Sequence, residues 1–210
     1  MAQTQPNPSS ISEEASGLEE APGQLIVLTG PSGVGKGTLV KALLREHSDE
    51  LFLSVSATTR SPRSGEVDGQ HYYFFSREQF EGAIENNELL EWAEFAGNYY
   101  GTPLKPIEER IAKGERILLE IELEGARQVA KVFPEALRIF VLPPSMDELE
   151  RRLRSRGQDS DEAINRRLER AKVEVDAADE FNVTVVNDEL PAALDLLRSL
   201  LFPTPQVAHS

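Results

Sequence analysis

A glycine-rich segment near the start of the chain combines residue types that suit phosphate binding. It reads Gly30-Pro-Ser-Gly-Val-Gly-Lys36-Gly-Thr38, follows a short apolar run and precedes a helical pattern. Glycines let consecutive backbone N–H groups turn toward an anion, a helix N-terminus adds partial positive charge, and Lys36 can reach the β- and γ-phosphates of a nucleotide. The segment therefore predicts a nucleotide site of the P-loop kind. Its residues are Gly30, Pro31, Ser32, Gly33, Val34, Gly35, Lys36, Gly37 and Thr38.

The residue after Lys36 departs from the usual P-loop pattern, in which a serine or threonine there supplies a hydroxyl to magnesium. Gly37 has no side chain, and Thr38 comes next. Magnesium would then be held by the nucleotide's own oxygens and water, by Thr38, or by an acidic group elsewhere. The Gly-Lys-Gly-Thr ending resembles that of nucleoside monophosphate kinases, which favours phosphoryl transfer between small molecules over a GTPase.

A second group of residues suited to an anion lies between positions 54 and 74. Arg60 and Arg63 flank a proline and can present two guanidinium forks to one phosphate, and the hydroxyls of Ser56 and Tyr72 can complete the shell. A lone arginine or tyrosine in a hairpin usually serves as a solvated or packing group. It is the grouping of the four that indicates a second phosphate site.

The order of these residues resembles the guanylate kinase family. The GMP-binding signature of that family is matched by Thr58-Thr-Arg-Ser-Pro-Arg-Ser-Gly-Glu66 and by Gly69-Gln-His-Tyr-Tyr-Phe74. The likeness continues at residues 90–93, 97–102, 142–145, 152–157 and 186–188, and it spans about residues 24–202. It implies a kinase that transfers the γ-phosphoryl group of ATP to GMP or dGMP, giving ADP and GDP, in purine nucleotide metabolism. It assigns the first site to ATP and adds Asn187 to it.

The resemblance also implies a division of work within the GMP site. It gives the GMP phosphate to Arg60, Arg63, Tyr72 and Tyr100, and the guanine base to Ser56, Glu91 and Thr102. Guanine presents an N1–H and N2–H₂ donor pair that a carboxylate such as Glu91 can accept in parallel, whereas adenine lacks this pair. We therefore expect steep discrimination between GMP and AMP.

An acidic segment follows the apolar residues near position 118. Where the family usually carries Asp-x-Asp at the end of its third core strand, this chain has Glu120 and Glu122. We expect a strand over residues 117–123, with Glu120, Glu122 and Glu124 on one face. The resemblance places Glu122 in the GMP site. Magnesium accompanying ATP is the expected cofactor, and its protein ligands stay unassigned, with Thr38 and Glu120 as candidates.

Arginines are concentrated in a helical stretch near position 160: Arg151, Arg152, Arg154, Arg156, Arg166, Arg167 and Arg170. Some should be solvated helix-face charges, worth only tenths of a kcal/mol when paired. The resemblance implies that Arg152, Arg156 and Arg167 close over ATP as part of a lid. With Lys36 they are the predicted catalytic residues, because phosphoryl transfer needs cations around the phosphoryl oxygens and no general base.

The composition narrows the class of protein. The 210 residues carry 36 Asp and Glu against 22 Lys and Arg, a net charge of -14, and no cysteine. The acidic balance argues against nucleic-acid or membrane binding, and the absence of thiols excludes disulfides and Cys-ligated metals. No stretch approaches 18 consecutive apolar residues, and a secretion signal is not apparent. We expect a cytoplasmic protein whose partners are ATP and GMP, with no nucleic acid, membrane or obligate protein partner.

Short apolar runs at residues 25–28, 117–123, 138–142 and 183–186 alternate with helical patterns. This alternation predicts an α/β fold of the P-loop NTPase type, a parallel sheet with flanking helices. A β-rich GMP-binding insertion and a helical lid complete the expected architecture. The predicted divisions are an acidic disordered tail at 1–23, a kinase domain at 24–202 and a C-terminal tail at 203–210. Within that domain they are a core at 24–52, 102–146 and 181–202, the insertion at 53–101 and the lid at 147–180.

Two other functions fit parts of this pattern. A guanylate-kinase-like interaction domain would bind partner peptides without nucleotide chemistry, but Lys36 and the lid arginines argue against it. Another monophosphate kinase, such as an adenylate kinase, would share the P-loop. The signature at residues 58–74 and the carboxylate of Glu91 argue against that alternative.

Overall fold

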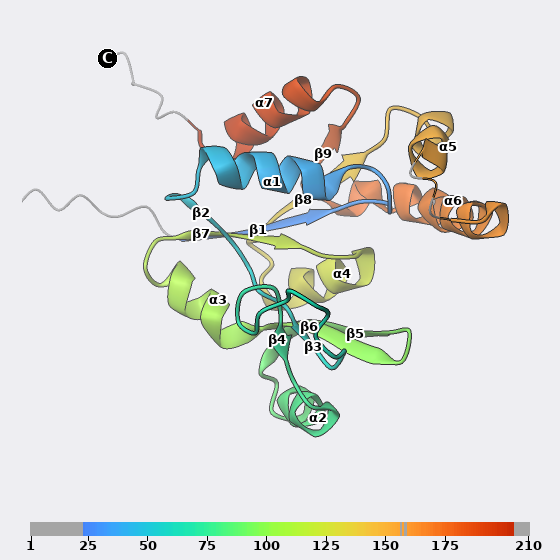
Figure 1. Ribbon diagram of the computed structural model, residues 1–210. Coiled ribbons are helices and arrows are strands. Elements are labelled where there is room, and N and C mark those ends of the chain that lie inside the picture. Colours follow the sequence, from blue (N-terminus) through green and yellow to red (C-terminus); the bar gives the residue numbers. More distant parts are fainter. Residues whose placement is uncertain (1–22, 156, 158, 204–210) are drawn as a thin grey trace, which may run out of the picture.

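The computed structural model of the protein describes residues 23–155, 157 and 159–203 (Figure 1). The predicted tails at 1–23 and 203–210 lie outside the described residues except for Gly23 and Pro203, and so does Arg156 of the predicted lid. Among the described helices, none combines the length and the apolar character needed to cross a membrane.

A five-stranded parallel sheet forms the centre of the molecule, in the order β2-β7-β1-β8-β9. Its strands are β1 (Gln24–Thr29), β2 (Leu51–Leu53), β7 (Arg116–Glu120), β8 (Leu137–Leu142) and β9 (Val183–Val186). The central strands are apolar and buried on both faces, which requires helices on both sides. The predicted strands at 25–28, 138–142 and 183–186 and the α/β fold class are confirmed.

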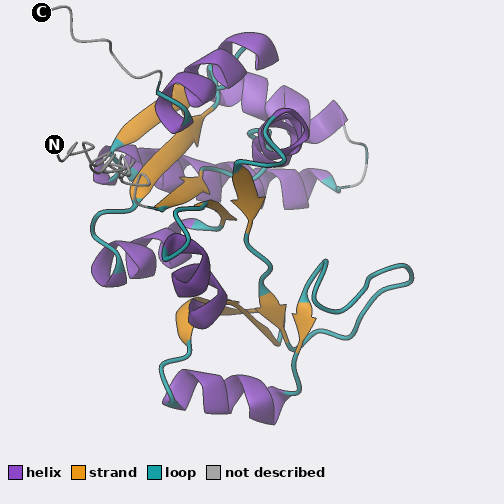
Figure 2. Cartoon of the chain, turned by 90° about the vertical axis from the view of Figure 1, so that its left-hand side faces the viewer, coloured by secondary structure: helices purple, strands orange, loops and turns teal. Residues whose placement is uncertain are grey.

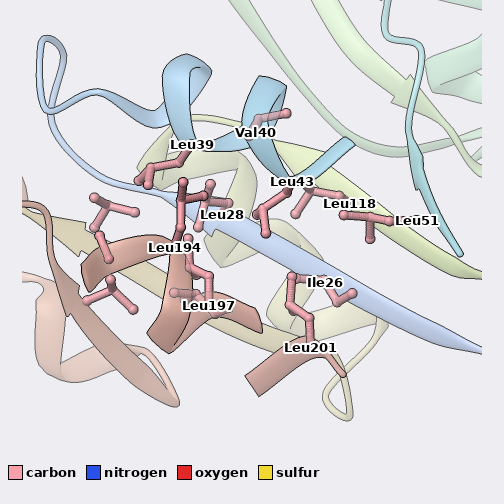
Figure 3. Close-up of a cluster of buried hydrophobic side chains, with 14 of the residues drawn as sticks. Ile26, Leu28, Leu39, Val40, Leu43, Leu51, Leu118, Leu194, Leu197 and Leu201 are labelled. Carbon is pink, nitrogen blue, oxygen red and sulfur yellow. The ribbon is translucent and has the colours of Figure 1, made fainter. Parts of the chain in front are cut away.

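Helices cover both faces of this sheet (Figure 1). On one face α1 (Lys36–Glu46) and α7 (Leu190–Leu201) pack together, and Leu39, Leu43 and Leu197 interlock with Ile26 and Leu28 of β1 (Figure 3). On the other face α3 (Leu104–Ile111) and α4 (Leu123–Val132) bury a second apolar cluster. The sheet is thereby fixed on both sides, and the carboxyl ends of its strands form a rigid edge for a ligand site.

The strand expected over residues 117–123 is shorter than predicted. Strand β7 ends at Glu120, and α4 begins at Leu123 with Glu122 as its N-cap residue. Glu124 therefore lies in the first turn of a helix, where a negative charge suits the helix dipole, and it accepts a hydrogen bond of 2.5 Å from Arg127. The prediction that Glu120, Glu122 and Glu124 share one face of a strand is wrong, because the chain has already left the strand.

A second sheet of four strands, in the order β4-β3-β6-β5, lies below the first in Figure 2. It contains β3 (Ala57–Thr58), β4 (Tyr73–Phe74), β5 (Leu89–Phe95) and β6 (Asn98–Pro103). The helix α2 (Arg77–Glu85) interrupts this β-rich region, and the sequence pattern did not predict it. It begins with a capping box, in which Ser76 and Gln79 satisfy each other's backbone N–H groups.

A helical hairpin follows β8. Helix α5 (Met146–Ser155) and helix α6 (Asp161–Asp176) pack through Leu149, Leu153, Ile164, Leu168 and Ala171, and the short 3-10 helix η1 (Ala178–Glu180) leads to β9. The helical character expected for this stretch is confirmed, since both segments are helices. The boundaries proposed for core, insertion and lid stay predictions.

Candidate active site

The loop between β1 and α1 packs tightly against its surroundings. Gly30 has a φ of 145° and Gly35 a φ of 102°, conformations that favour glycine. A Cβ on Gly30 would lie 2.3 Å from the backbone oxygen of Val141, and one on Gly35 would lie 2.5 Å from Nδ2 of Asn187. Glycine is therefore required where this loop passes β8 and the residue after β9.

Lys36 is the first residue of α1 and turns back over this loop. Its Nζ donates hydrogen bonds to the backbone oxygens of Gly30 at 2.5 Å and Pro31 at 3.4 Å. Burial lowers the pKa of Lys36, and the nearby carboxylates of Glu120 and Glu122 oppose that shift. The ammonium group thus lies at the centre of the loop, where it can meet phosphate oxygens.

A polar cleft of about 620 Å³ opens above the loop. It is lined by Ser32, Gly33, Gly35, Lys36, Gly37, Thr38, Lys41, Tyr72, Glu120, Ile121 and Glu122. Glu120 lies opposite Gly37, because its Oε1 is 3.7 Å from the place where a Cβ on Gly37 would stand. A carboxylate therefore faces the position at which other P-loops carry a hydroxyl.

The described residues contain no cluster of three or more His, Cys, Asp or Glu side chains arranged to hold a metal. Magnesium bound with a nucleotide does not require such a cage, because it commonly keeps several waters and takes one or two carboxylates besides phosphate oxygens. The carboxylate of Glu120 and the hydroxyl of Thr38 line the same cleft and are hard oxygen donors. This donor set fits magnesium. Partial burial raises the pKa of Glu120, and Lys36 and Lys41 oppose that rise.

A larger cavity, of about 970 Å³, lies between the second sheet, the end of β7 and α6. Its lining includes the predicted GMP residues Ser56, Tyr72, Glu91, Tyr100 and Glu122. It also includes Arg167 of the predicted lid. The two cavities share the lining residues Ser32, Tyr72, Glu120, Ile121 and Glu122, so they adjoin each other.

Glu91 forms a buried corner of the larger cavity. It is only 7% exposed, and the Oγ1 of Thr102 donates a hydrogen bond of 2.6 Å to its Oε1. Burial raises the pKa of Glu91, although the Thr102 hydrogen bond opposes the rise. Helix α4 supports this corner: a Cβ on Gly125 would lie 2.6 Å from Oε2 of Glu91, and the Gln128 amide makes hydrogen bonds of 3.0 and 2.9 Å with the backbone N and O of Trp92.

The predicted phosphate arginines lie at the rim of this region. Arg60 forms a bidentate pair with Glu66, with hydrogen bonds of 3.0 and 2.9 Å. Its guanidinium carbon is 5.4 Å from the ring centre of Tyr72. Arg63 is exposed. Within the part of the chain that the structure describes, Tyr72 and Tyr100 line the larger cavity, whereas neither arginine lines it or the cleft.

Arg152 of the predicted lid lies against the outer side of the phosphate loop. Its guanidinium donates to the backbone oxygens of Asn187 at 2.9 Å, Asp188 at 3.3 Å and Val34 at 3.4 Å, and its Nε donates to Glu148 at 2.8 Å. The Asn187 amide donates to Val34 at 2.8 Å. The structure thus brings Arg152 and Asn187 together, and both support the loop from the side away from Glu91.

Arg167 and Arg170 extend from α6 toward the cavities. Arg167 donates to the hydroxyl of Ser32 at 2.7 Å and forms an ion pair with Asp159. Arg170 forms ion pairs with Glu122 and with Glu174, the latter at 2.7 Å. Arg167 therefore links the helical hairpin directly to the phosphate loop.

Comparison with known proteins identifies the relationship. The family model of guanylate kinase matches residues 22–203. The chain belongs to the guanylate kinase family. A curated guanylate kinase of Nostoc sp. is 61% identical over 86% of this chain and 90% of its own length, and one of Synechocystis sp. is 62% identical over 85% and 93%. The crystal structure of guanylate kinase from Anaplasma phagocytophilum aligns with a TM-score of 0.67 at 34% identity, covering 87% of this chain and 86% of its own.

For a guanylate kinase, three residues of this site were not predicted from the sequence. Glu66 belongs to the matched signature, but no function was predicted for it. Gly125 and Gln128 were not predicted to belong to the site. Gly125 and Gln128 lie 34 and 36 positions from the residues they touch, Glu91 and Trp92. Local spacing in a sequence carries no signal for contacts at such separations.

Proposed function

We propose that this guanylate kinase transfers the γ-phosphoryl group of ATP to GMP or dGMP, with magnesium accompanying ATP. The observation that carries the proposal is the shared wall of two adjoining cavities, one built on the phosphate loop and the other on Glu91. Two nucleotides bound there would meet at the carboxyl end of β7. An oxygen of the GMP phosphate would attack the γ-phosphorus of ATP, the bond to the β-phosphate oxygen would break, and ADP and GDP would leave.

The ATP side of the proposed site is the cleft above the loop. Backbone N–H groups of residues 30–38 would cradle the phosphates, with Lys36 at the β- and γ-phosphates. Lys36 donates to the loop's own carbonyls, so its ammonium is held within reach of any anion there. Asn187, held against Val34, borders the loop on the side away from GMP and would contact the rest of ATP.

The GMP side of the proposed site is the larger cavity. Glu91 would accept the N1–H and N2–H₂ groups of guanine, and Ser56 would supply a hydroxyl to the base. Thr102 is fully buried and donates its hydroxyl to Glu91, so it would act on the base through that carboxylate. The Thr102 hydrogen bond holds one oxygen of Glu91 in place and leaves the other oxygen free of it. Tyr72 and Tyr100 line the same cavity and would bind the GMP phosphate with Arg60 and Arg63 at its rim, a set that Glu122 completes.

Magnesium supplies charge neutralisation at the β- and γ-phosphate oxygens when it is bound. Glu120 and Thr38 would hold it, directly or through water. Because Gly37 has no side chain, the carboxylate of Glu120 can lie close to the phosphate loop, at the position where other P-loops carry a hydroxyl.

Catalysis in this proposal rests on position and charge. The phosphate of GMP is already an anionic nucleophile, so no side chain needs to remove a proton. Lys36 and Arg167 would place cations around the transferring group, where preorganised charge stabilises the transition state. Arg152 would act at the outer side of the loop, and Arg156 would join the lid. The acidic net charge supports action on free nucleotides and not on nucleic acid or anionic membranes. The proposal places this reaction in the cytoplasm, without an obligate protein partner.

Product analysis tests this proposal. The full chain is incubated with ATP, GMP and magnesium, and nucleotides are separated by ion-exchange chromatography over time. The expected result is formation of ADP and GDP in equal amounts, and no ADP when GMP is omitted. Formation of ADP and phosphate without GDP would show an ATPase and would contradict the proposal. Absence of any turnover together with peptide binding would favour an interaction domain instead.

A further inference from the structure

The exposed loop between β3 and β4 is organised around one carboxylate. Glu66 accepts three hydrogen bonds, two from the guanidinium of Arg60 and one of 2.7 Å from the backbone N–H of Arg63. Every other residue from 61 to 71 is exposed, whereas the Glu66 side chain is only 19% exposed. The Arg60 hydrogen bonds hold the pKa of Glu66 below its ordinary value, so the carboxylate stays ionised at neutral pH. Glu66 therefore ties the side chain of Arg60 to the backbone at Arg63, across the turn of the loop.

The hydrogen bonds of Arg60 leave one edge of its guanidinium available. Its Nη1 and Nη2 atoms donate to Glu66, and Nη1 also donates to the backbone oxygen of Ser61 at 2.7 Å. A guanidinium carries five N–H groups in a rigid plane, and these bonds account for three of them. The remaining two, the Nε–H and one N–H of Nη2, form a parallel fork on the adjoining edge. Among the described residues, the hydrogen bonds of good geometry to this guanidinium are those to Glu66 and Ser61. The hydrogen bonds with Glu66 raise the pKa of Arg60, and the hydroxyl of Tyr100, which lines the larger cavity, adds to that rise and so lies beside the guanidinium.

Two neighbouring aromatic rings lie on one side of the same guanidinium. Its central carbon is 5.4 Å from the ring centre of Tyr72 and 5.9 Å from that of Phe74. Tyr72 lines both cavities, so Arg60 packs against a residue that forms the wall of the site. The rings pack beside the guanidinium, and the bidentate hydrogen bond with Glu66 limits its rotation within the plane. The free fork is therefore held on the edge of the guanidinium that Glu66 does not occupy.

We propose that Glu66 is the positioning residue of the GMP phosphate site: it turns the free fork of Arg60 toward the phosphate and fixes the backbone at Arg63. This inference rests on the proposed function, since it takes GMP as the ligand. A carboxylate near a phosphate also repels it, so the opposite role, competition with GMP for Arg60, is the alternative. Positioning is favoured because the fork that suits a phosphate is the edge Glu66 does not use.

Calorimetric titration of the full chain with GMP, and separately with ATP, distinguishes the two roles. The central variant is Glu66→Gln, which keeps the size of the side chain but places an amide N–H₂ against the donors of Arg60. We expect its dissociation constant for GMP to rise on the order of ten- to a hundredfold, and that for ATP to change by less than about twofold. Glu66→Asp keeps the charge and should recover part of the loss.

Two further variants make the test specific. In an Arg60→Ala background, Glu66→Gln should change GMP affinity by less than about threefold, because residues that act through each other are not additive. The matched control is Glu81→Gln, which breaks another Glu–Arg pair, with Arg77 at 3.0 Å, on a helix beside the same sheet. It should leave both dissociation constants unchanged.

Each outcome decides the matter. Tighter GMP binding by Glu66→Gln would show that Glu66 competes with the phosphate and would overturn the proposal. An equal loss of GMP affinity in the Arg60→Ala background, or an equal loss of ATP affinity, would show a merely structural role and would also overturn it. Failure of the unmodified chain to bind GMP would instead contradict the proposed function, which the first titration shows before any variant is made.

Discussion

The hydroxyl of Thr102 donates a hydrogen bond of 2.6 Å to the carboxylate of Glu91, across the antiparallel pair of β5 and β6. The two residues are directly opposite in the register of these strands, so the bond is built into the sheet. It holds one carboxylate oxygen in a fixed place and leaves the group ready to accept donors from the cavity. Base recognition in the proposed reaction depends on this pair.

Replacing Glu91 with Gln tests that dependence. The amide would direct N–H donors at the N–H donors of guanine, whereas it would not oppose adenine in the same way. We expect the ratio of kcat/KM for GMP to that for AMP to fall on the order of a hundredfold or more. A coupled assay with each acceptor measures the ratio. A variant that keeps the preference for GMP would show that another residue reads the base.

The raised pKa of Glu91 predicts a pH dependence. Glu91 must be ionised to accept both guanine donors, and burial moves its pKa above the ordinary value of 4.5. Affinity for GMP should therefore fall as the pH is lowered through this raised pKa. The phosphate of GMP also titrates, near pH 6, but equally in both proteins. The ratio of affinities of the unmodified chain and Glu91→Gln, measured between pH 4.5 and 8, should decrease toward acid. A ratio independent of pH would contradict an ionised Glu91 as the acceptor.

Gly125 tests the support of Glu91 from helix α4. An alanine there would place its Cβ 2.6 Å from Oε2 of Glu91, and the carboxylate would have to move. We expect GMP affinity to fall on the order of tenfold, because the displaced carboxylate would no longer meet the guanine donors in the right place. ATP affinity should stay unchanged, because a side-chain end can move aside without a shift of the backbone.

Gly82→Ala is the matched control for that substitution. Gly82 also lies in a helix, but among the described residues nothing lies within 4 Å of a Cβ built there. It should stabilise the fold by up to about 1 kcal/mol and leave GMP affinity unchanged. Equal effects of the two alanines on GMP binding would contradict a specific contact between Gly125 and Glu91.

Replacing Lys36 with Ala should lower turnover by on the order of 10²–10³, as expected for the loss of one preorganised charge in a phosphoryl-transfer site. GMP affinity should change little, because Lys36 lines the cleft above the loop and not the cavity around Glu91. Initial rates and calorimetric titration measure the two effects. Lys172→Ala, which removes a surface lysine paired with Glu169, is the control. Near-normal turnover would contradict the assignment of the phosphate loop.

Sequence reasoning succeeded where the signal was local. The apolar run, glycine turn and helix around Lys36 are consecutive in the chain, and each has its own pattern. The expected strand over residues 117–123 failed for a local reason as well: apolar residues continue past Glu120, and only the N-cap conformation of Glu122 shows that a helix has begun. Helix α2 was missed because a nine-residue helix inside a β-rich region carries few periodic positions.

The candidate site was predictable only in part for a different reason. Signature residues such as Tyr72 and Glu91 were predicted to share a site, and they line one cavity. The residues that support them were not predicted, because they come from distant parts of the chain: Gln128 contacts Trp92, and Arg170 contacts Glu122. The pairing of the Arg60 guanidinium with the Glu66 carboxylate likewise depends on a loop conformation that residue types alone do not specify.

The most direct measurement compares acceptors at equal concentration. Initial rates of ADP formation by the full chain, with ATP and magnesium, are determined with GMP, AMP, UMP and no acceptor. The account predicts rapid ADP formation with GMP and rates with AMP and UMP that stay near the rate without acceptor. Comparable rates with AMP or UMP, or equal ADP formation in all four reactions, would contradict a guanylate kinase whose base specificity lies in Glu91.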